Sequence, residues 1–470
     1  MVPFFPRQIA HRAVIVYLAS LITVSLVYFD YIMAAKYFFL GLAWVLGFFY
    51  LTNYLTITWR IKSIQDFRTG LFTVAILLRL AWVVFFYFYC IRTNGSPFEF
   101  GAADSLGYHN EAVWLAGEKW SVAMKYYFGQ RAYDFSDVGY PLYLTVLYKV
   151  AGSGVFLPRV IKAILGALTC LLVYRLSSRT FGEQVGRMAG IMMALMPNLI
   201  IYCGYHLKET EMLFLEVAFL ERLDYAIRSK KINMWNVLLP LLLAGSLFFF
   251  RTILGAAAVF AFVTAVVFSP APIMKKGWRR TALIGWGLLG LVVIGGGRVA
   301  TLAEGLWEGR DTNVSNKRLE QTLRGNQWAQ YATGTVMAPM AFVLPYATMV
   351  DVDKQYSQLE KSGGNYVRNF MGFFVILAFY EAIRRKKWRD FALIGSFVIA
   401  YLGVVSLSGF SNAERFLLPG LPCLIMIWAY GISELRRESY RLVYPWCIIV
   451  FLMELGWAFF KLGSRGLFQS

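Results

Sequence analysis

Two short acidic motifs in an otherwise apolar chain have the residue types needed for proton transfer. The first, residues 101–112, reads Gly-Ala-Ala-Asp-Ser-Leu-Gly-Tyr-His-Asn-Glu-Ala, in which Tyr108, His109 and Glu111 follow Asp104 on the next helical turns. A carboxylate at Asp104 can accept a proton from a hydroxyl, which is the usual role of a general base. Aspartate before a helical run is also a common N-cap. Both interpretations of Asp104 stay open at this point.

The second motif, residues 205–211, reads Tyr-His-Leu-Lys-Glu-Thr-Glu and lies in a short turn between two apolar segments. In a functional interpretation, Lys208 faces a phosphate and Glu209 faces a sugar hydroxyl or a cation. In the structural alternative, the turn is an ordinary interfacial cap from which Lys208 extends its ammonium group toward water.

Four further charged residues interrupt apolar segments. Arg251 separates two of them and Arg415 begins another. A guanidinium group matches the geometry of phosphate oxygens, so these two arginines are candidates for holding a phosphate. Arg79 and Glu216 lie within spans, where an ionisable group needs a partner, and we expect them to form a structural ion pair.

Histidine and cysteine give little support for a metal site. His109 and His206 lie close to the acidic motifs and could bind a divalent metal, although simple hydrogen bonding is the favoured interpretation. The five cysteines form no CxxC pair and lie in or beside apolar segments, as packing residues do. A divalent metal is therefore a possible cofactor, but no residue is assigned as its ligand.

The elements that position these motifs are predicted to be transmembrane helices. The chain has 470 residues, 58% hydrophobic and only 16% charged, whereas soluble domains carry about 25% charged residues. The net charge of +19 is concentrated in basic clusters in every second loop. This alternation follows the positive-inside rule and argues against a nucleic-acid partner. It predicts an all-α, multi-pass protein of the cell (inner) membrane with a cytoplasmic N-terminus.

The basic clusters divide the chain into about thirteen spans, with the C-terminus outside: 13–31, 36–57, 70–92, 157–178, 184–203, 208–226, 233–249, 252–269, 281–297, 366–384, 391–408, 415–432 and 441–460. Two long outer loops result, at 91–156 and 298–365. The first contains apolar pieces at 107–128 and 138–150 that we expect to lie as helices at the membrane interface. In the second, the apolar stretch 335–350 is predicted to be a re-entrant or interfacial segment, because a crossing there would place the basic cluster at 384–389 outside.

Several motifs together resemble the GT-C superfamily of membrane glycosyltransferases, which includes protein O-mannosyltransferases and lipid A aminoarabinose transferases. They are Leu-Arg-Leu-Ala-Trp at 78–82, the Asp104 motif, Gly-Tyr-Pro-Leu-Tyr at 139–143 and Leu-Lys-Glu-Thr-Glu at 207–211. The resemblance covers roughly residues 70–300, with a weaker echo at 414–422. The chain then divides into two additional N-terminal spans (1–69), a GT-C-like core (70–300), and a last part (301–470) with the re-entrant segment and the C-terminal spans.

The resemblance implies an inverting transfer of a monosaccharide from a polyprenyl phosphate to a hydroxyl of a lipid, glycan or protein at the outer face. Asp104 would be the general base, Glu209 the second acidic residue, and Lys208, Arg251 and Arg415 the ligands of the donor phosphate. The residues expected to bind substrate are Tyr108, His109, Glu111, Tyr140 and His206. The chain lacks a clear Asp-x-Asp or Asp-Glu pair at the loop, which leaves the role of a second carboxylate open between Glu111 and Glu209.

Two other functions remain as alternatives. A polysaccharide polymerase or ligase would use a lipid-diphosphate donor in a similar pocket. A transporter of lipid-linked glycans commonly shows paired halves with polar groups at the midplane, whereas this sequence has no evident internal duplication and its unusual polar groups lie in predicted outer loops.

Overall fold

The computed structural model describes residues 3–130, 137–229, 234–268, 285, 340–351, 356–407 and 414–463. All regular structure in these ranges is helical, and their single β-bridge joins Ile32 to Val350. The elements are α1 Arg7–Val27, η1 Phe29–Tyr31, α2 Ala35–Leu46, η2 Gly47–Leu51, α3 Thr52–Thr58, η3 Trp59–Ile61, α4 Ile64–Asn94, α5 Ala103–Gly117, α6 Trp120–Lys125, η4 Tyr126–Gln130, α7 Gly139–Ala151, α8 Phe156–Phe181, α9 Glu183–Leu195, α10 Pro197–Gly204, α11 Glu209–Arg228, α12 Met234–Phe250, α13 Thr252–Phe268, α16 Tyr356–Glu360, α17 Ser362–Arg384, η9 Trp388–Phe391, α18 Ala392–Leu407, α19 Glu414–Leu417, η10 Leu418–Gly420, α20 Leu421–Ser433 and α21 Arg437–Gly463.

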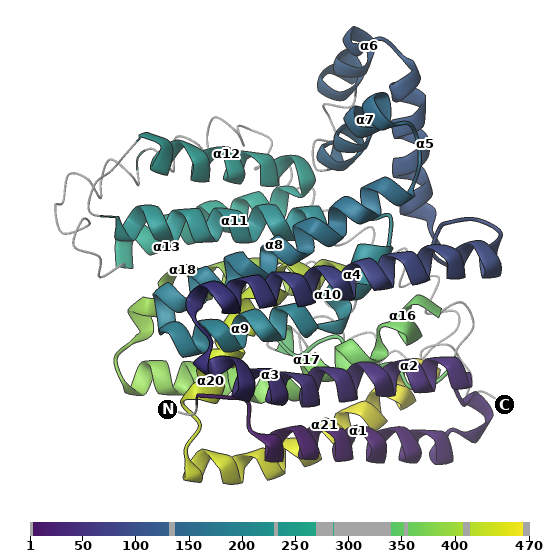
Figure 1. Ribbon diagram of the computed structural model, residues 1–470. Helices are drawn as coiled ribbons and strands as arrows, with labels where there is room; N and C mark the ends of the chain where they lie inside the picture. Colours follow the sequence, from purple (N-terminus) through teal and green to yellow (C-terminus); the bar gives the residue numbers. More distant parts are fainter. Residues whose placement is uncertain are drawn as a thin grey trace.

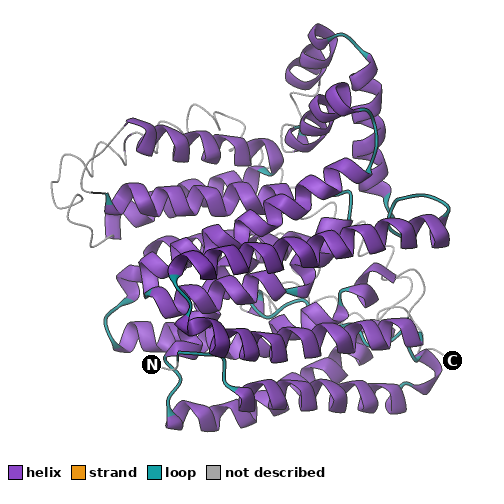
Figure 2. Ribbon diagram, in the orientation of Figure 1, coloured by secondary structure: helices purple, strands orange, loops and turns teal. Residues whose placement is uncertain are grey.

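The long helices lie side by side in a bundle, and α5, α6 and α7 form a separate group beyond one end of it (Figures 1 and 2). Among the described residues, eight helices are long and apolar enough to cross a membrane, or nine if the bent pair α9–α10 is one span. The expected all-α polytopic architecture is therefore confirmed, but the count of thirteen spans is not. Helices α12 and α13 have 17 residues each, α11 is rich in charge, and the predicted span 281–297 lies outside the described ranges.

Within the described ranges, the turns that carry basic clusters gather at one end of the bundle. Arg187, at the start of α9, donates hydrogen bonds to the carbonyls of Trp59 (2.8 Å) and Lys62 (2.9 Å) in the turn before α4. Phe181, at the end of α8, packs against the rings of Phe391 and Tyr430, at 4.8 and 5.1 Å between centroids. We call this the far end and the opposite one the site end. Figure 1 places the start of α1 and the end of α21 at opposite ends of the bundle, as the predicted topology requires.

A break between α9 and α10 shapes the centre of the bundle. The two helices meet at an angle of 43°, and Pro197 has no N–H to donate to the carbonyl of Met193. Arg79 of α4 replaces the missing donor, because its guanidinium bonds the carbonyls of Met193 (3.1 Å) and Ala194 (3.2 Å). Gly166 of α8 gives this guanidinium its space, since a Cβ there would lie 2.7 Å from the Nε atom of Arg79.

The predicted ion pair between Arg79 and Glu216 is therefore wrong. Arg79 is held by backbone carbonyls, and Glu216 is fully buried in α11, where neither carboxylate oxygen has a hydrogen-bond partner. The sequence suggested the pair because both groups interrupt apolar segments. A broken helix offers carbonyl acceptors that satisfy an arginine equally well, and sequence spacing does not reveal them.

Residues 340–351 follow an irregular, buried path beside α17. Arg368 of α17 donates to the carbonyl of Ala341 (2.8 Å), and the Asn369 amide donates to the carbonyls of Val343 (2.6 Å) and Pro345 (2.9 Å). Irregular backbone at membrane depth needs such partners, because no water is present to replace them. This arrangement suits the predicted re-entrant segment, whose residues 335–339 lie outside the described part, and the re-entrant topology stays a prediction.

The helices beyond the site end correspond to the predicted interfacial pieces. At 15 and 13 residues, α5 and α7 are too short to span a bilayer. They pack on each other through a small core of Tyr108, Ala112, Tyr140, Leu144 and Tyr148. This core fixes the start of α5, and with it Asp104, over the ends of the bundle helices.

Candidate functional site

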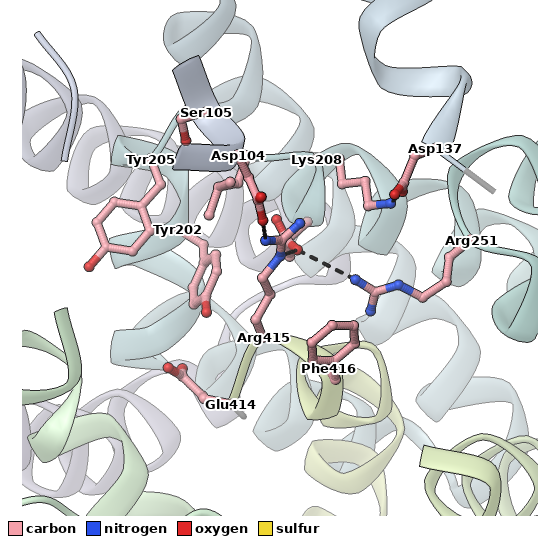
Figure 3. Close-up of polar contacts among 12 residues, drawn as sticks. Asp104, Ser105, Asp137, Tyr202, Tyr205, Lys208, Arg251, Glu414, Arg415 and Phe416 are labelled. Carbon is pink, nitrogen blue, oxygen red and sulfur yellow. Dashed lines mark hydrogen bonds and ion pairs between the residues drawn. The ribbon is translucent and has the colours of Figure 1, made fainter. Parts of the chain in front are cut away.

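Four chain segments that end or begin at the site end bring the predicted residues together (Figure 3). Asp104 lies in the first turn of α5, and Glu209 begins α11 directly after Lys208. Arg251 occupies the break between α12 and α13, and Arg415 lies in the short helix α19. Residues more than 300 positions apart in sequence therefore share one small region.

Arg415 is the centre of this region. Its Nη1 donates to a carboxylate oxygen of Asp104, and its Nε donates to Oε1 of Glu209 at 2.5 Å. Its Nη2 points to the Tyr108 hydroxyl at 3.4 Å. The Asp104 side chain is 58% exposed, that of Arg415 is 21% exposed, and that of Glu209 is fully buried. One guanidinium thus connects a carboxylate that solutes can reach with one that they cannot.

The N-cap interpretation of Asp104 is contradicted. The N-cap residue of α5 is Ala102, it makes no side-chain capping bond, and Asp104 lies inside the first turn. A carboxylate in the first turn is favoured by the partial positive charge of the helix N-terminus. Asp104 is consequently held by the helix dipole and by Arg415, with its side chain at the surface of the site.

Arg251 is the second cation on Glu209. Its Nη2 lies 3.7 Å from Oε1 of Glu209, and its Nη1 donates to the Tyr401 hydroxyl at 3.1 Å. The guanidinium also stacks over the ring of Phe416, at 4.7 Å from the centroid. A fully buried carboxylate needs compensating charge, and Glu209 obtains it from two arginines that come from distant segments.

Lys208 forms the edge of the site next to α7. Its ammonium group pairs with Asp137 and donates to the carbonyl of Phe250 at 2.6 Å. Gly139 at the start of α7 permits this close packing, because a Cβ there would lie 2.8 Å from the Phe250 ring. Burial, and the positive charge of Arg251 nearby, lower the pKa of Lys208 to about 7. Its charge is therefore sensitive to pH and to any anion that approaches.

The two histidines are joined through one tyrosine. The Tyr148 hydroxyl lies 2.9 Å from Nδ1 of His109 and 3.1 Å from Nε2 of His206. Burial lowers the pKa of His109, and it lowers that of His206 well below the usual value, so both rings favour the neutral form. Within the described ranges, no group of three or more His, Cys, Asp or Glu side chains has a geometry that could hold a metal ion.

The remaining predicted residues lie around this core in supporting positions. Tyr140 is fully buried: its ring packs against that of Tyr108, 5.3 Å between centroids, and the Lys162 ammonium lies 5.0 Å from its centroid. Glu111 lies two turns beyond Asp104 on α5 and is partly buried. The carboxylate that shares Arg415 with Asp104 is Glu209, which favours Glu209 as the second acidic residue.

Sequence reasoning missed several residues that complete the site. Tyr401 lies inside an apolar helix and gives no local signal, whereas Phe416 adjoins Arg415 in sequence. Asp137 lies two residues before the Gly-Tyr-Pro motif, among other polar loop residues. Glu414, next to Arg415, is buried and bonded to the Asn198 amide at 2.5 Å. Its role depends on partners that only the tertiary structure brings close.

Comparison with known proteins finds similarity at the level of solved structures. No protein-family description and no curated protein sequence matches the chain. ArnT from Cupriavidus metallidurans, in a crystal structure with undecaprenyl phosphate, aligns over 83% of this chain and 64% of its own, with 16% identity and a TM-score of 0.49. The archaeal oligosaccharyltransferase AglB from Archaeoglobus fulgidus, in complex with an inhibitory peptide and a dolichol phosphate, aligns over 83% and 56%, with 13% identity and a TM-score of 0.46. The chain thus spans less than two thirds of the length of either protein.

Proposed function

We propose that this chain is a GT-C-type glycosyltransferase that moves a monosaccharide from a polyprenyl phosphate to an acceptor hydroxyl. The proposal rests on one observation: Arg415 contacts both Asp104 and Glu209, and Arg251 lies beside the same glutamate. It combines an accessible proton acceptor with guanidinium groups that suit a phosphate. The sequence resemblance to GT-C transferases leads to the same function independently of this geometry.

In the proposed reaction, Asp104 accepts the proton of the acceptor hydroxyl while that oxygen attacks the anomeric carbon of the donor sugar. The new carbon–oxygen bond forms as the bond between the anomeric carbon and the phosphate oxygen breaks, and its electron pair leaves with the polyprenyl phosphate. Attack opposite the leaving group inverts the anomeric configuration. Arg415, Arg251 and Lys208 stabilise the charge that develops on the phosphate, and fixed cations at such a position lower the barrier.

The burial of Glu209 gives it a positioning role in this proposal. Its side chain is fully buried between two guanidinium groups, so it orients Arg415 and Arg251 toward the phosphate without itself reaching the acceptor. Asp104, at 58% side-chain exposure, is the carboxylate that an acceptor hydroxyl can approach. The acceptor is a hydroxyl of a lipid, a glycan or a protein.

The proposed topology places this chemistry at the outer face of a cell membrane. The basic clusters that the structure describes lie in turns at the far end, which the positive-inside rule assigns to the cytoplasm. The site end then faces outward, where cytosolic nucleotide sugars are absent and a membrane-borne donor supplies the activated sugar.

The test uses purified protein in nanodiscs with a panel of polyprenyl-phosphate monosaccharides and, for comparison, lipid-diphosphate glycans. Release of polyprenyl phosphate and transfer to added acceptors are both measured. The Asp104→Asn variant keeps the size of the side chain but removes the base, so we expect turnover to fall by about 10²–10⁴-fold. Turnover with diphosphate donors alone would redirect the proposal to a polymerase or ligase.

Asp66→Asn is the matched control, because Asp66 also lies in the first turn of a long helix, α4, at the far end. It should leave turnover unchanged. Full activity in the purified Asp104→Asn variant, at wild-type yield and thermal stability, would remove Asp104 from the role of base. Absence of turnover with every donor in wild type would reject the transferase.

A further inference from the structure

A second buried polar cluster lies directly behind the site, on the other side of α19. The Lys361 ammonium pairs with Oε2 of Glu414 at 3.0 Å, and the Asn198 amide donates to Oε1 of the same carboxylate at 2.5 Å. The same amide also donates to Oδ1 of Asn365, at 2.8 Å. Asn198 is the second residue of α10, Lys361 directly precedes α17, and Glu414 begins α19. Two other segments thus converge on one glutamate.

Glu414 and Arg415 are neighbours in sequence, but their side chains point in different directions. Figure 3 shows Arg415 directed toward Asp104 and Glu414 directed away from it, toward the side of Tyr202. The two carboxylates on Arg415 therefore belong to α5 and α11, and the carboxylate nearest to it in sequence is occupied elsewhere. An unpaired Glu414 would be an obvious competitor for the Arg415 guanidinium, since a buried charge strongly favours a partner.

The backbone at the start of α17 is packed closely against its neighbours, so Lys361 and Asn365 have little freedom to move relative to Glu414. A Cβ on Gly364 would lie 1.5 Å from Oδ1 of Asn198, and a Cβ on Gly363 would lie 2.7 Å from the carbonyl oxygen of Gly41 in α2. Both glycines follow Lys361 within three residues. The N-terminal span pair thus presses against the start of α17, and this contact fixes the place from which Lys361 reaches Glu414.

We infer that Lys361 is a positioning residue for the donor phosphate: by pairing with Glu414, it keeps that carboxylate from capturing Arg415. The inference rests on the proposed function, in which Arg415 binds the phosphate. Lys361 does not itself touch the substrate in this scheme. It determines which carboxylates hold Arg415 and therefore where the guanidinium is presented.

The experiment measures the affinity of purified protein in nanodiscs for undecaprenyl phosphate without sugar. Lys361→Met should weaken binding by about tenfold or more, because the freed Glu414 draws Arg415 away. The double variant Lys361→Met with Glu414→Gln should recover most of the lost affinity, since the competing carboxylate is gone. A merely structural role for the pair predicts instead a loss of thermal stability in the single variant, with Arg415 still in contact with Asp104 and Glu209.

Arg385→Met is the matched control, because Arg385 directly follows the other end of α17 and pairs there with Glu434, which directly follows α20. It should leave the affinity unchanged. Wild-type binding by Lys361→Met, failure of the double variant to recover, or equal loss in Arg385→Met would each overturn the inference. Arg415→Gln separates the two proposals: if it binds as tightly as wild type, the phosphate role of Arg415 itself fails.

A structural readout tests the inference even without ligand. In a structure of Lys361→Met determined by cryo-electron microscopy, the Arg415 guanidinium should lie against Glu414 and no longer against Asp104. If Arg415 keeps its contacts with Asp104 and Glu209, the inference is overturned, whatever the donor proves to be.

Discussion

The helix pair formed by α17 and α19–α20 carries an ion pair at each end, and the two ends differ in how they hold their glutamates. At the far end, Glu381 accepts hydrogen bonds from Arg384 (2.8 Å) and Arg385 (3.1 Å) and lies 3.8 Å from Arg436. Arg385 also bonds Glu434. The arginine side chains there are 27–45% exposed. At the site end, Lys361 and Glu414 are only 11% and 6% exposed.

The two ends thus differ in whether a glutamate has several interchangeable cations, as Glu381 does, or one specific cation, as Glu414 does. At the far end, several partly exposed arginines share Glu381, so the loss of one leaves others in place, and Arg385, which pairs with Glu434, is itself partly exposed to water. At the site end, Glu209, Glu414 and Asp104 receive their cations from different segments in fixed directions. Loss of Lys361 there leaves the buried Glu414 without a counter-ion, held only by the Asn198 amide, which is much more costly. Four predictions test this contrast, in order of decreasing effect.

The largest effect is expected for Arg415→Gln, which removes the guanidinium from both carboxylates and from the phosphate. Transfer should fall by about 10²–10³-fold, the usual loss when a preorganised electrostatic group is removed. The far-end counterpart Arg385→Gln should change turnover by less than about twofold. Steady-state kinetics of both variants, with thermal unfolding as a control for folding, decides the matter. Equal losses in the two variants would abolish the contrast between the ends.

A smaller effect is expected from the titration of Lys208, which should change the affinity for the polyprenyl phosphate by up to about tenfold per pH unit. Its pKa in the empty site is lowered to about 7 by burial and by Arg251, and a bound phosphate favours the charged amine. Binding therefore takes up a proton, and affinity should be greatest below pH 7 and fall as the pH rises above it. Lys208→Arg should remove this dependence, while the titration of the phosphate itself is common to both proteins. Dissociation constants measured from pH 6 to pH 9 would show parallel curves if the prediction is wrong.

A third prediction concerns the dependence of the two ion pairs on salt. Double-mutant cycles should give a coupling energy for Arg385 and Glu434 that falls by about half between 0.1 and 1 M salt, because ions screen partly exposed charges. The coupling between Lys361 and Glu414 should stay constant, since the pair is shielded from solvent. Thermal or denaturant unfolding of the single and double variants provides the energies. A salt-sensitive Lys361–Glu414 coupling would show that solvent reaches the cluster.

The smallest effect is expected from the two histidines, on the pH dependence of the melting temperature. Burial lowers the pKa of His109 and His206 in the folded protein, whereas in the unfolded chain histidine titrates near pH 6.5. Their contribution to stability is therefore complete above that pH and is lost as the pH falls below it. The melting temperature should drop by a few degrees between pH 7.5 and pH 5.5, and less in His206→Gln. An identical slope in wild type and His206→Gln would contradict the prediction.

Much of the fold was predictable because composition and charge placement act over whole segments. The apolar helices, the basic turns at one end and the short helices at 107–128 and 138–150 follow from properties that do not depend on tertiary partners. The sequence gives a wrong prediction where the role of a residue depends on its tertiary partner. Arg79 was paired with Glu216 by analogy of position, but a proline break supplied carbonyl acceptors that the pattern did not reveal.

The candidate site shows the same division. Asp104, Lys208, Glu209, Arg251 and Arg415 stood out as charges beside apolar segments, and the structure brings all five into one region. Tyr401 and Lys361 did not stand out, because a tyrosine in an apolar helix and a lysine in a polar loop are both unremarkable locally. Their importance arises from what they contact.

The sequence by itself determined that this is a polytopic helical membrane protein with apolar helices and basic turns, because lipid imposes those patterns on every segment separately. Only the tertiary structure decided which carboxylates share Arg415 and which one is kept from it by Lys361. The physical reason is that the energy of a buried charge depends on the direction and distance of its partners, and these are set by the packing of helices far apart in the chain.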